Sequence, residues 1–136
     1  MFEWFEHTAD LGIRVRAASL EVLFAEAAEA LVATIVLAPE LIEPKEAFSV
    51  RLKDDDLAYL LMDWLRELLY RFETSRQVFG TFTTQIRGSI LEATAWGERL
   101  DPDRHGLNHE VKAITYHGLR LEKKEDTWLA EFIVDI

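Results

Sequence analysis

The stretch that decides the fold is LAYLLMDWLRELLYRF, residues 57–72. Its large apolar side chains recur every three or four residues, which is the period of one face of an α-helix. The acidic triplet at 54–56 comes directly before it, and carboxylates there suit the positive, unpaired amino end of a helix. The stretch therefore predicts the main core helix, with a buried face formed by Leu57, Leu60, Leu61, Trp64, Leu65, Leu68, Leu69 and Phe72.

On the N-terminal side of this helix the pattern predicts two strands and a second helix. Residues 48–52 alternate apolar and polar side chains, which is typical of a half-buried strand. Further upstream, apolar positions from residue 20 to 35 follow helical spacing, with Ser19 as the N-cap and prolines after the end. Residues 12–17 alternate apolar and basic side chains and predict the first strand.

On the C-terminal side the pattern changes to period two. It predicts strands at 78–86, 90–96, 111–121 and 127–134, turns at 88–89 and 123–126, and a loop at 99–109. The order is strand–helix–strand–helix followed by four strands. Residues 1–136 are thus expected to form a single α+β domain, with a mostly antiparallel sheet and two helices. Whether the first two strands pair in parallel or antiparallel fashion stays open.

Composition excludes several classes of function. The chain has 136 residues, 15 basic and 25 acidic side chains, a net charge of −10 and no cysteine. Without cysteine there can be no disulfide, Cys-ligated zinc, iron–sulfur cluster or thiol nucleophile. The acidic excess argues against direct nucleic-acid binding, which needs clustered lysine and arginine. No phosphate-binding glycine loop or nucleophile elbow is present, so nucleophilic catalysis is not expected.

The sequence also lacks the marks of a membrane or exported protein. Its first residues, MFEWFEHTAD, are acidic where a signal peptide is basic, and no apolar segment follows them. The most apolar stretch, residues 27–38, contains Glu29 and is too short to span a bilayer. We therefore expect a cytoplasmic protein with no membrane partner.

Two segments far apart in the sequence could supply oxygen ligands. His7 and Asp10 come just before a predicted strand, where they could form a metal or acid/base pair, or simply complete a turn. Asp135 brings a side-chain carboxylate next to the carboxylate of Ile136, and such a pair suits Ca²⁺ or Mg²⁺. The alternative for this second segment is a solvated chain end.

Two other groups of polar residues are open to interpretation. His105, His109 and His117 accompany the acidic residues of segment 97–105, but the nearby proline, glycine and asparagine argue against the helix that a zinc pair would need. A hydrogen-bonded loop or a partner-facing surface is the better interpretation. The roles of these histidines and of His7 stay open.

On the core helix, Asp63 and Glu67 lie opposite the apolar stripe. They form a solvated face or, as the sharper alternative, a docking surface for a basic partner.

Taken together and in this order, several separated blocks resemble the archease family over nearly the full length. The blocks are FEHTADLGI (5–13), LLMDWLRELLY (60–70), the segment 97–105, VKAITYH (111–117) and the ending Asp135-Ile136. Arg66 stands at a helix position that is often asparagine in the family, a departure expected to affect only the surface.

The resemblance implies a fold with a strand–helix–strand–strand module, and a function in tRNA processing. Archeases are activators of the RtcB-type tRNA-splicing ligase, not enzymes themselves. They promote guanylylation of the ligase and its multiple turnover, and they broaden its nucleotide use. Carried over by motif, the family's metal site corresponds to Asp10, Asp135 and Ile136.

From this resemblance we expect a divalent cation, calcium or alternatively magnesium, held by oxygen ligands only. The expected partner is an RtcB-type RNA ligase, with no direct contact to nucleic acid. Two other functions stay open: a stand-alone metal-dependent phosphoester hydrolase that uses the same carboxylates, and a general chaperone or adaptor module.

Overall fold

The structure is a computed structural model, and it describes residues 1–7 and 10–136. Its helices and strands in chain order are β1 (Phe2–His7), β2 (Asp10–Ala17), α1 (Leu20–Ile35), the short 3-10 helix η1 (Pro39–Leu41), β3 (Glu46–Lys53), α2 (Leu57–Ser75), β4 (Gln77–Arg87), β5 (Ile90–Arg99), α3 (Pro102–His105), β6 (Ala113–Lys124) and β7 (Thr127–Asp135). Within the described residues, no helix is both long enough and apolar enough to cross a membrane.

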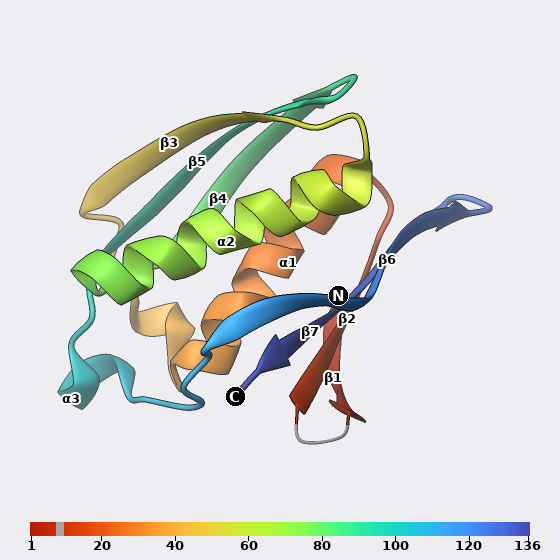
Figure 1. Ribbon diagram of the computed structural model, residues 1–136. Coiled ribbons are helices and arrows are strands. Elements are labelled where there is room, and N and C mark those ends of the chain that lie inside the picture. Colours follow the sequence, from red (N-terminus) through yellow and green to blue (C-terminus); the bar gives the residue numbers. More distant parts are fainter. Residues whose placement is uncertain (8–9) are drawn as a thin grey trace.

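The elements form three layers, with the two long helices between two antiparallel sheets (Figure 1). One sheet has the strand order β1-β2-β7-β6, and the other has the order β3-β5-β4. The predicted α+β class and antiparallel pairing are confirmed, but the strands divide between two sheets. The strands β2 and β3, which flank α1, do not pair with each other in either direction because they belong to different sheets.

The strand–helix–strand–strand module that the resemblance implies corresponds to β3, α2, β4 and β5. The last strand of this module, β5, pairs with both β3 and β4 and so lies in the middle of its sheet. The other sheet is discontinuous in sequence, because β2 pairs on one side with β1 and on the other with β7. Segments from opposite ends of the chain thus become neighbours.

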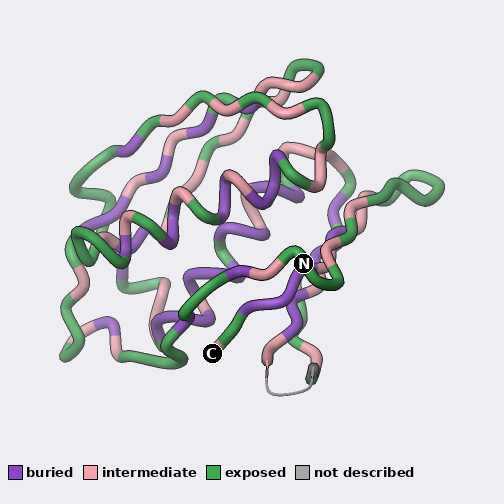
Figure 2. The backbone as a smooth tube through the Cα atoms, in the orientation of Figure 1, coloured by how far each residue is buried: buried purple, intermediate pink, exposed green. Residues whose placement is uncertain are grey.

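Both long helices begin where the sequence predicts. Ser19 caps α1 by accepting a hydrogen bond from the backbone N–H of Val22 at 3.2 Å. Asp56 caps α2 by accepting one from the N–H of Ala58 at 2.8 Å. Buried residues cover most of the circumference of α1, which explains its unusually apolar sequence, since it has a sheet on either side. Figure 2 shows the buried positions concentrated along the two long helices and recurring along the strands.

Trp64 lies at the centre of the packing between the two helices. Its side chain is fully buried, and its indole N–H donates a hydrogen bond to the carbonyl of Phe24 on α1 at 3.1 Å. The ring of Phe82 meets it edge to face, with 6.1 Å between ring centroids. The predicted core helix thus bonds directly to its neighbour as well as burying its apolar stripe.

We expect Trp64→Phe to lower the free energy of unfolding by about 2 kcal/mol, because it loses both buried volume and this hydrogen bond. Urea denaturation followed by circular dichroism measures the loss. The control is Tyr70→Phe on the exposed side of the same helix, for which a change below about 0.5 kcal/mol is expected. Equal losses in the two variants would show that the indole has no special role.

Two local expectations were wrong. Residues 2–7 form a strand that pairs with β2, although Trp4 and Phe5 interrupt the alternation by which a strand is recognised. Residues 102–105 form a short helix within the segment predicted as a loop. Asp101 caps it, Pro102 occupies its first turn and Gly106 ends it at φ 73°, so the proline and glycine begin and end this helix instead of preventing it.

Candidate metal centre

The sheet register places Asp10 directly opposite Asp135. Asp10 is the first residue of β2 and Asp135 is the last residue of β7, and the antiparallel pairing makes them cross-strand partners. Directly opposed residues point to the same side of a sheet, with Cβ atoms about 4.5–5.5 Å apart. The two carboxylates that the sequence places 125 positions apart are therefore neighbours on one face, as the sequence hypothesis requires.

That face is the outer one, turned away from the helices. Along β7 the side chains of Phe132 and Val134 are fully buried, so alternation directs Asp135 to the opposite side. Asp135 is exposed and Asp10 is half-buried. A cation bound between them would be open to solvent and to a partner protein.

Two main-chain features hold this edge of the sheet in place. The backbone N–H of Lys112 donates to the carbonyl of Asp135 at 2.7 Å, which ties the last residue of β7 to the start of β6. Ile136 follows, and its side chain packs against the hydrophobic core. Main-chain oxygens of Ile136 therefore lie immediately beside the Asp135 carboxylate along the chain.

Gly12, two residues along β2 from Asp10, leaves space on the outer face for the ring of Phe5 from the neighbouring strand β1. The ring of Phe5 covers Gly12, and a Cβ atom at this position would lie 2.3 Å from that ring. The guanidinium of Arg14 stacks on the same Phe5 ring, 4.7 Å from its centroid. Only glycine leaves space for the aromatic ring, so the hairpin beside Asp10 depends on this residue.

The donor set fits a hard cation. Carboxylate and main-chain oxygens are the ligands that Ca²⁺ and Mg²⁺ prefer, and the described residues here offer both. No group of three or more His, Cys, Asp or Glu side chains suited to a metal occurs among residues 1–7 and 10–136. The two aspartates would thus need main-chain oxygens, water or a partner's groups to complete a shell. The backbone of His7 lies opposite Asp10, whereas its side chain and residues 8–9 are outside the described part.

His105 has a structural role. Its ring is fully buried, Nδ1 accepts a hydrogen bond from the N–H of Asp101 at 2.9 Å, and Nε2 lies 3.0 Å from a carboxylate oxygen of Glu98. Both ring nitrogens are therefore engaged with the protein. His109 and His117 are exposed, so the three histidines do not form one group.

Glu98 is the centre of a buried ionic cluster that joins three segments. It accepts hydrogen bonds from Arg104 at 2.5 Å and from the backbone N–H of Glu43 at 2.6 Å, besides its contact with His105. The Arg104 guanidinium, then the Glu43 N–H and His105, lower the pKa of Glu98 from 4.5 to about 2 although burial opposes this shift. The cluster fastens α3 and the segment after η1 to β5, and so shapes the loop without adding a ligand site.

The two acidic residues on the core helix, Asp63 and Glu67, have different surroundings. Asp63 and Glu67 are both half-buried, and Asp63 borders a surface hollow that also contains Asp54. Burial raises the pKa of Asp63 and the nearby Asp54 charge raises it further, whereas Arg66 lowers it. Asp63 is thus the partly desolvated member of the pair, and whether the pair serves as a solvated face or as a docking surface stays a prediction.

Comparisons with known proteins identify the same family along nearly the whole chain. Residues 2–136 match the family model described as "Archease protein family (MTH1598/TM1083)". A protein archease of Pyrococcus abyssi is 42% identical over 140 residues, which covers 99% of this chain and 98% of that protein. One from Methanopyrus kandleri is 38% identical over 139 residues and covers 99% of both. The solution structure of protein 1598 of Methanobacterium thermoautotrophicum superposes with a TM-score of 0.82, at 31% identity and 99% and 98% coverage.

Proposed function

This chain belongs to the archease family, and on that basis we propose that it activates an RtcB-type tRNA-splicing ligase in the cytoplasm. In this proposal the chain is not itself an enzyme. It promotes guanylylation of the ligase, allows the ligase to turn over repeatedly, and broadens its nucleotide use. The observation that carries the proposal is the pairing of Asp10 with Asp135 on an open sheet face, in a chain that matches the family from residue 2 to 136.

In the proposed mechanism, Asp10, Asp135 and the main-chain oxygens of Ile136 would hold a divalent cation, calcium or magnesium, at the sheet edge. When bound, the cation supplies positive charge that can stabilise phosphate or carboxylate oxygens. The residues contribute position: β2 and β7 fix the two carboxylates, and the Lys112 N–H fixes the Asp135 backbone. Because this face is open, the site can meet the ligase's nucleotide pocket directly.

The acidic surface supports the first step, which is docking. A net charge of −10 favours encounter with a basic protein that itself binds RNA, and such steering weakens as salt rises. The same charge disfavours direct contact of this chain with RNA phosphates. The chain is therefore proposed to act on the ligase and not on the RNA.

The test is a ligation assay in which RNA ends exceed the ligase about tenfold or more. With this chain present we expect product to exceed one ligation per ligase molecule, and without it product should stop near one. The same chain incubated alone with a phosphoester substrate should release nothing. Hydrolysis by the chain alone would favour the hydrolase alternative, and suppression of unrelated protein aggregation without any ligase effect would favour the chaperone alternative.

A further inference from the structure

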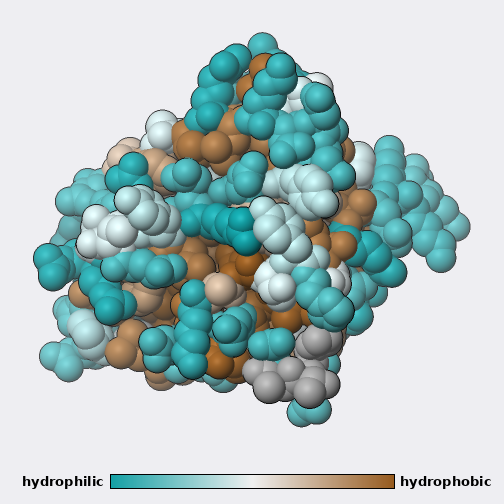
Figure 3. Space-filling view, viewed as in Figure 1, coloured by the Kyte–Doolittle hydropathy of each residue, from teal (hydrophilic) through white to brown (hydrophobic). Residues whose placement is uncertain are grey.

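A hollow of about 220 Å³ lies between α2 and β6, away from the outer sheet face that carries Asp10 and Asp135. Asp54, Tyr59, Asp63 and Tyr116 line it. The two tyrosines are 48% and 50% exposed, so about half of each side chain is accessible to a ligand. On this face, hydrophilic side chains lie directly beside hydrophobic ones (Figure 3).

Tyr116 lies where the pairing of β6 becomes irregular. The pairing with β7 is regular up to Thr115 and resumes only at Arg120, so the intervening residues bulge out of the sheet. Gly118 permits the bulge with φ 73°, and a Cβ atom there would lie 2.7 Å from the Ile133 side chain. Ile114, two residues before Tyr116, belongs to the hydrophobic core, so alternation turns Tyr116 toward α2 as well.

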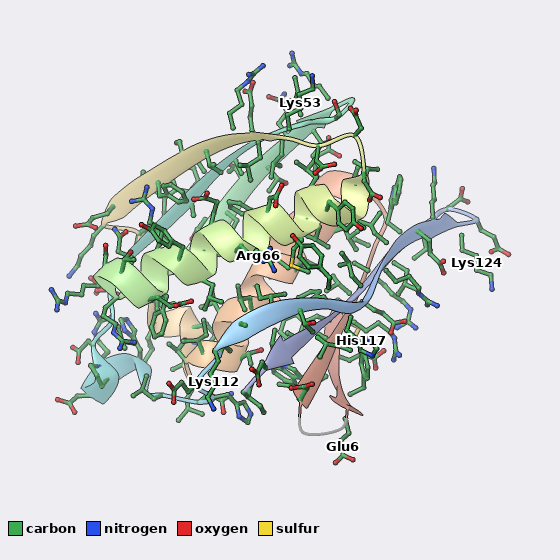
Figure 4. All side chains as sticks on the ribbon, viewed as in Figure 1. Glu6, Lys53, Arg66, Lys112, His117 and Lys124 are labelled. Carbon is green, nitrogen blue, oxygen red and sulfur yellow. The ribbon has the colours of Figure 1, made fainter. Side chains whose placement is uncertain are left out.

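Arg66 holds Tyr116 in position. Its guanidinium lies 4.3 Å from the centroid of the Tyr116 ring and donates to the Tyr116 hydroxyl at 2.7 Å and to the Ile114 carbonyl at 3.2 Å. Figure 4 shows Arg66 on the side of α2 that faces β6. Although its side chain is exposed, as expected of a surface departure from the family, Arg66 thus links α2 to β6. Tyr59 meets Tyr116 edge to face, with centroids 5.6 Å apart at 88°.

The hollow has an excess of negative charge. Burial and the nearby Asp54 charge both raise the pKa of Asp63, while Arg66 only partly offsets them. Two of the five N–H donors of Arg66 bond to Tyr116 and Ile114, and neither of these bonds goes to a carboxylate. One carboxylate oxygen of Asp54 accepts from the N–H of Asp56 at 2.9 Å, which fixes this side chain at the rim. Two aromatic rings and two carboxylates around one space are the groups that bind an organic cation.

We propose that this hollow receives an arginine or lysine side chain from a protein partner. The entering cation would lie against the tyrosine rings and pair with Asp63 and Asp54, relieving the repulsion between them. The overall charge of −10 favours the approach of a basic surface. The identity of the partner rests on the proposed function, whereas the recognition of a cationic side chain rests on the hollow alone.

The first test uses N-acetyl-arginine methylamide as the probe, with the isosteric but uncharged citrulline derivative as its control. In two-dimensional NMR titrations, we expect saturable shifts at Tyr59, Asp63 and Tyr116 with the arginine probe only. Asp63→Asn should weaken this binding about fivefold or more, because one ion-pair partner is lost. Asp55→Asn, at an exposed position in the same acidic triplet, is the matched control and should bind as the parent does.

The proposal is overturned if the arginine probe gives no saturable shift at the hollow, or if the citrulline probe shifts the same residues equally. Unchanged affinity in Asp63→Asn would overturn it as well. Sedimentation at increasing concentration addresses a different occupant. A dimer that Asp63→Asn abolishes would assign the hollow to a second copy of this chain and so contradict a foreign partner.

The second test separates this proposal from the proposed function. In the ligation assay, Asp63→Asn should raise the concentration of this chain that gives half-maximal stimulation, and the plateau should stay unchanged. A lower plateau at unchanged half-maximal concentration would contradict a docking role. If the parent chain does not stimulate the ligase at all, the proposed function fails, while the NMR result still decides whether the hollow binds a cationic side chain.

Discussion

Asp10→Asn is expected to abolish the stabilisation of this protein by Ca²⁺ and to remove its effect on ligase turnover. The change keeps the size of the side chain but replaces one carboxylate oxygen by an amide NH2, and so takes one of the two opposed carboxylates from the sheet edge. Ligand binding at 100 times Kd stabilises a folded protein by about 2.7 kcal/mol, so the parent should show a rise in Tm of several degrees. In the variant this rise should vanish, and ligation should stop near one product per ligase molecule.

Calorimetry with and without Ca²⁺ measures the first effect, and the ligation assay with excess RNA ends measures the second. Asp126→Asn is the matched control, because Asp126 is an exposed acid in the turn at the far end of β7. It should respond to Ca²⁺ and stimulate the ligase as the parent does. A Ca²⁺ response retained in Asp10→Asn would remove the metal site, and full stimulation without the response would separate activation from the metal.

Glu98→Ala is expected to cost about 2–3 kcal/mol of folding free energy, because it removes a buried acceptor that several donors share. Glu98 is 5% exposed, and its loss takes an acceptor from Arg104, His105 and the Glu43 N–H, although Arg104 keeps the carbonyl of Leu41. Urea denaturation at pH 7 measures the loss. The control is Glu92→Gln on the same strand. Glu92 forms an exposed ion pair with Arg51, and its loss should change the free energy of unfolding by less than about 0.5 kcal/mol.

The same cluster predicts a pH dependence. Because the pKa of Glu98 is about 2 in the folded protein and 4.5 ordinarily, the folded state favours its ionised form. This contribution is complete above about pH 4.5 and is lost as the pH falls from 4.5 toward 2, with a total of about 3 kcal/mol. Glu98→Gln should therefore unfold with a shallower dependence on pH across this interval. An identical slope in parent and variant would contradict the role given to the cluster.

The helices were predictable because their signals are local. The apolar stripe of α2 and the caps Ser19 and Asp56 involve residues within one or two turns of each other. A period-two pattern shows that a segment is a strand and which face is buried, but it contains no information about the partner strand. For this reason the strands other than β1 were predicted, whereas their division into two sheets was not.

For the candidate sites too, single residues could be identified from the sequence, but their contacts could not. Asp10 and Asp135 could be identified from the sequence as residues at strand ends, but their opposition depends on the pairing of β2 with β7. The contacts of Tyr116 with Arg66 and Tyr59 depend on how β6 packs against α2, and β6 pairs irregularly with β7 around Gly118. A glycine inside an alternating segment is the one clue that could have indicated this departure from regular pairing.

The position of β7 between β2 and β6 has a consequence for synthesis on the ribosome. Until β7 has emerged, β2 can pair only with β1, whereas β3, α2, β4 and β5 are contiguous in sequence and can associate earlier. We therefore expect the three-stranded layer to form first and the four-stranded layer to close last, since pairing between distant segments is slow. The two opposed aspartates would then meet only in the final step of folding, so a chain that has not finished folding cannot present them together.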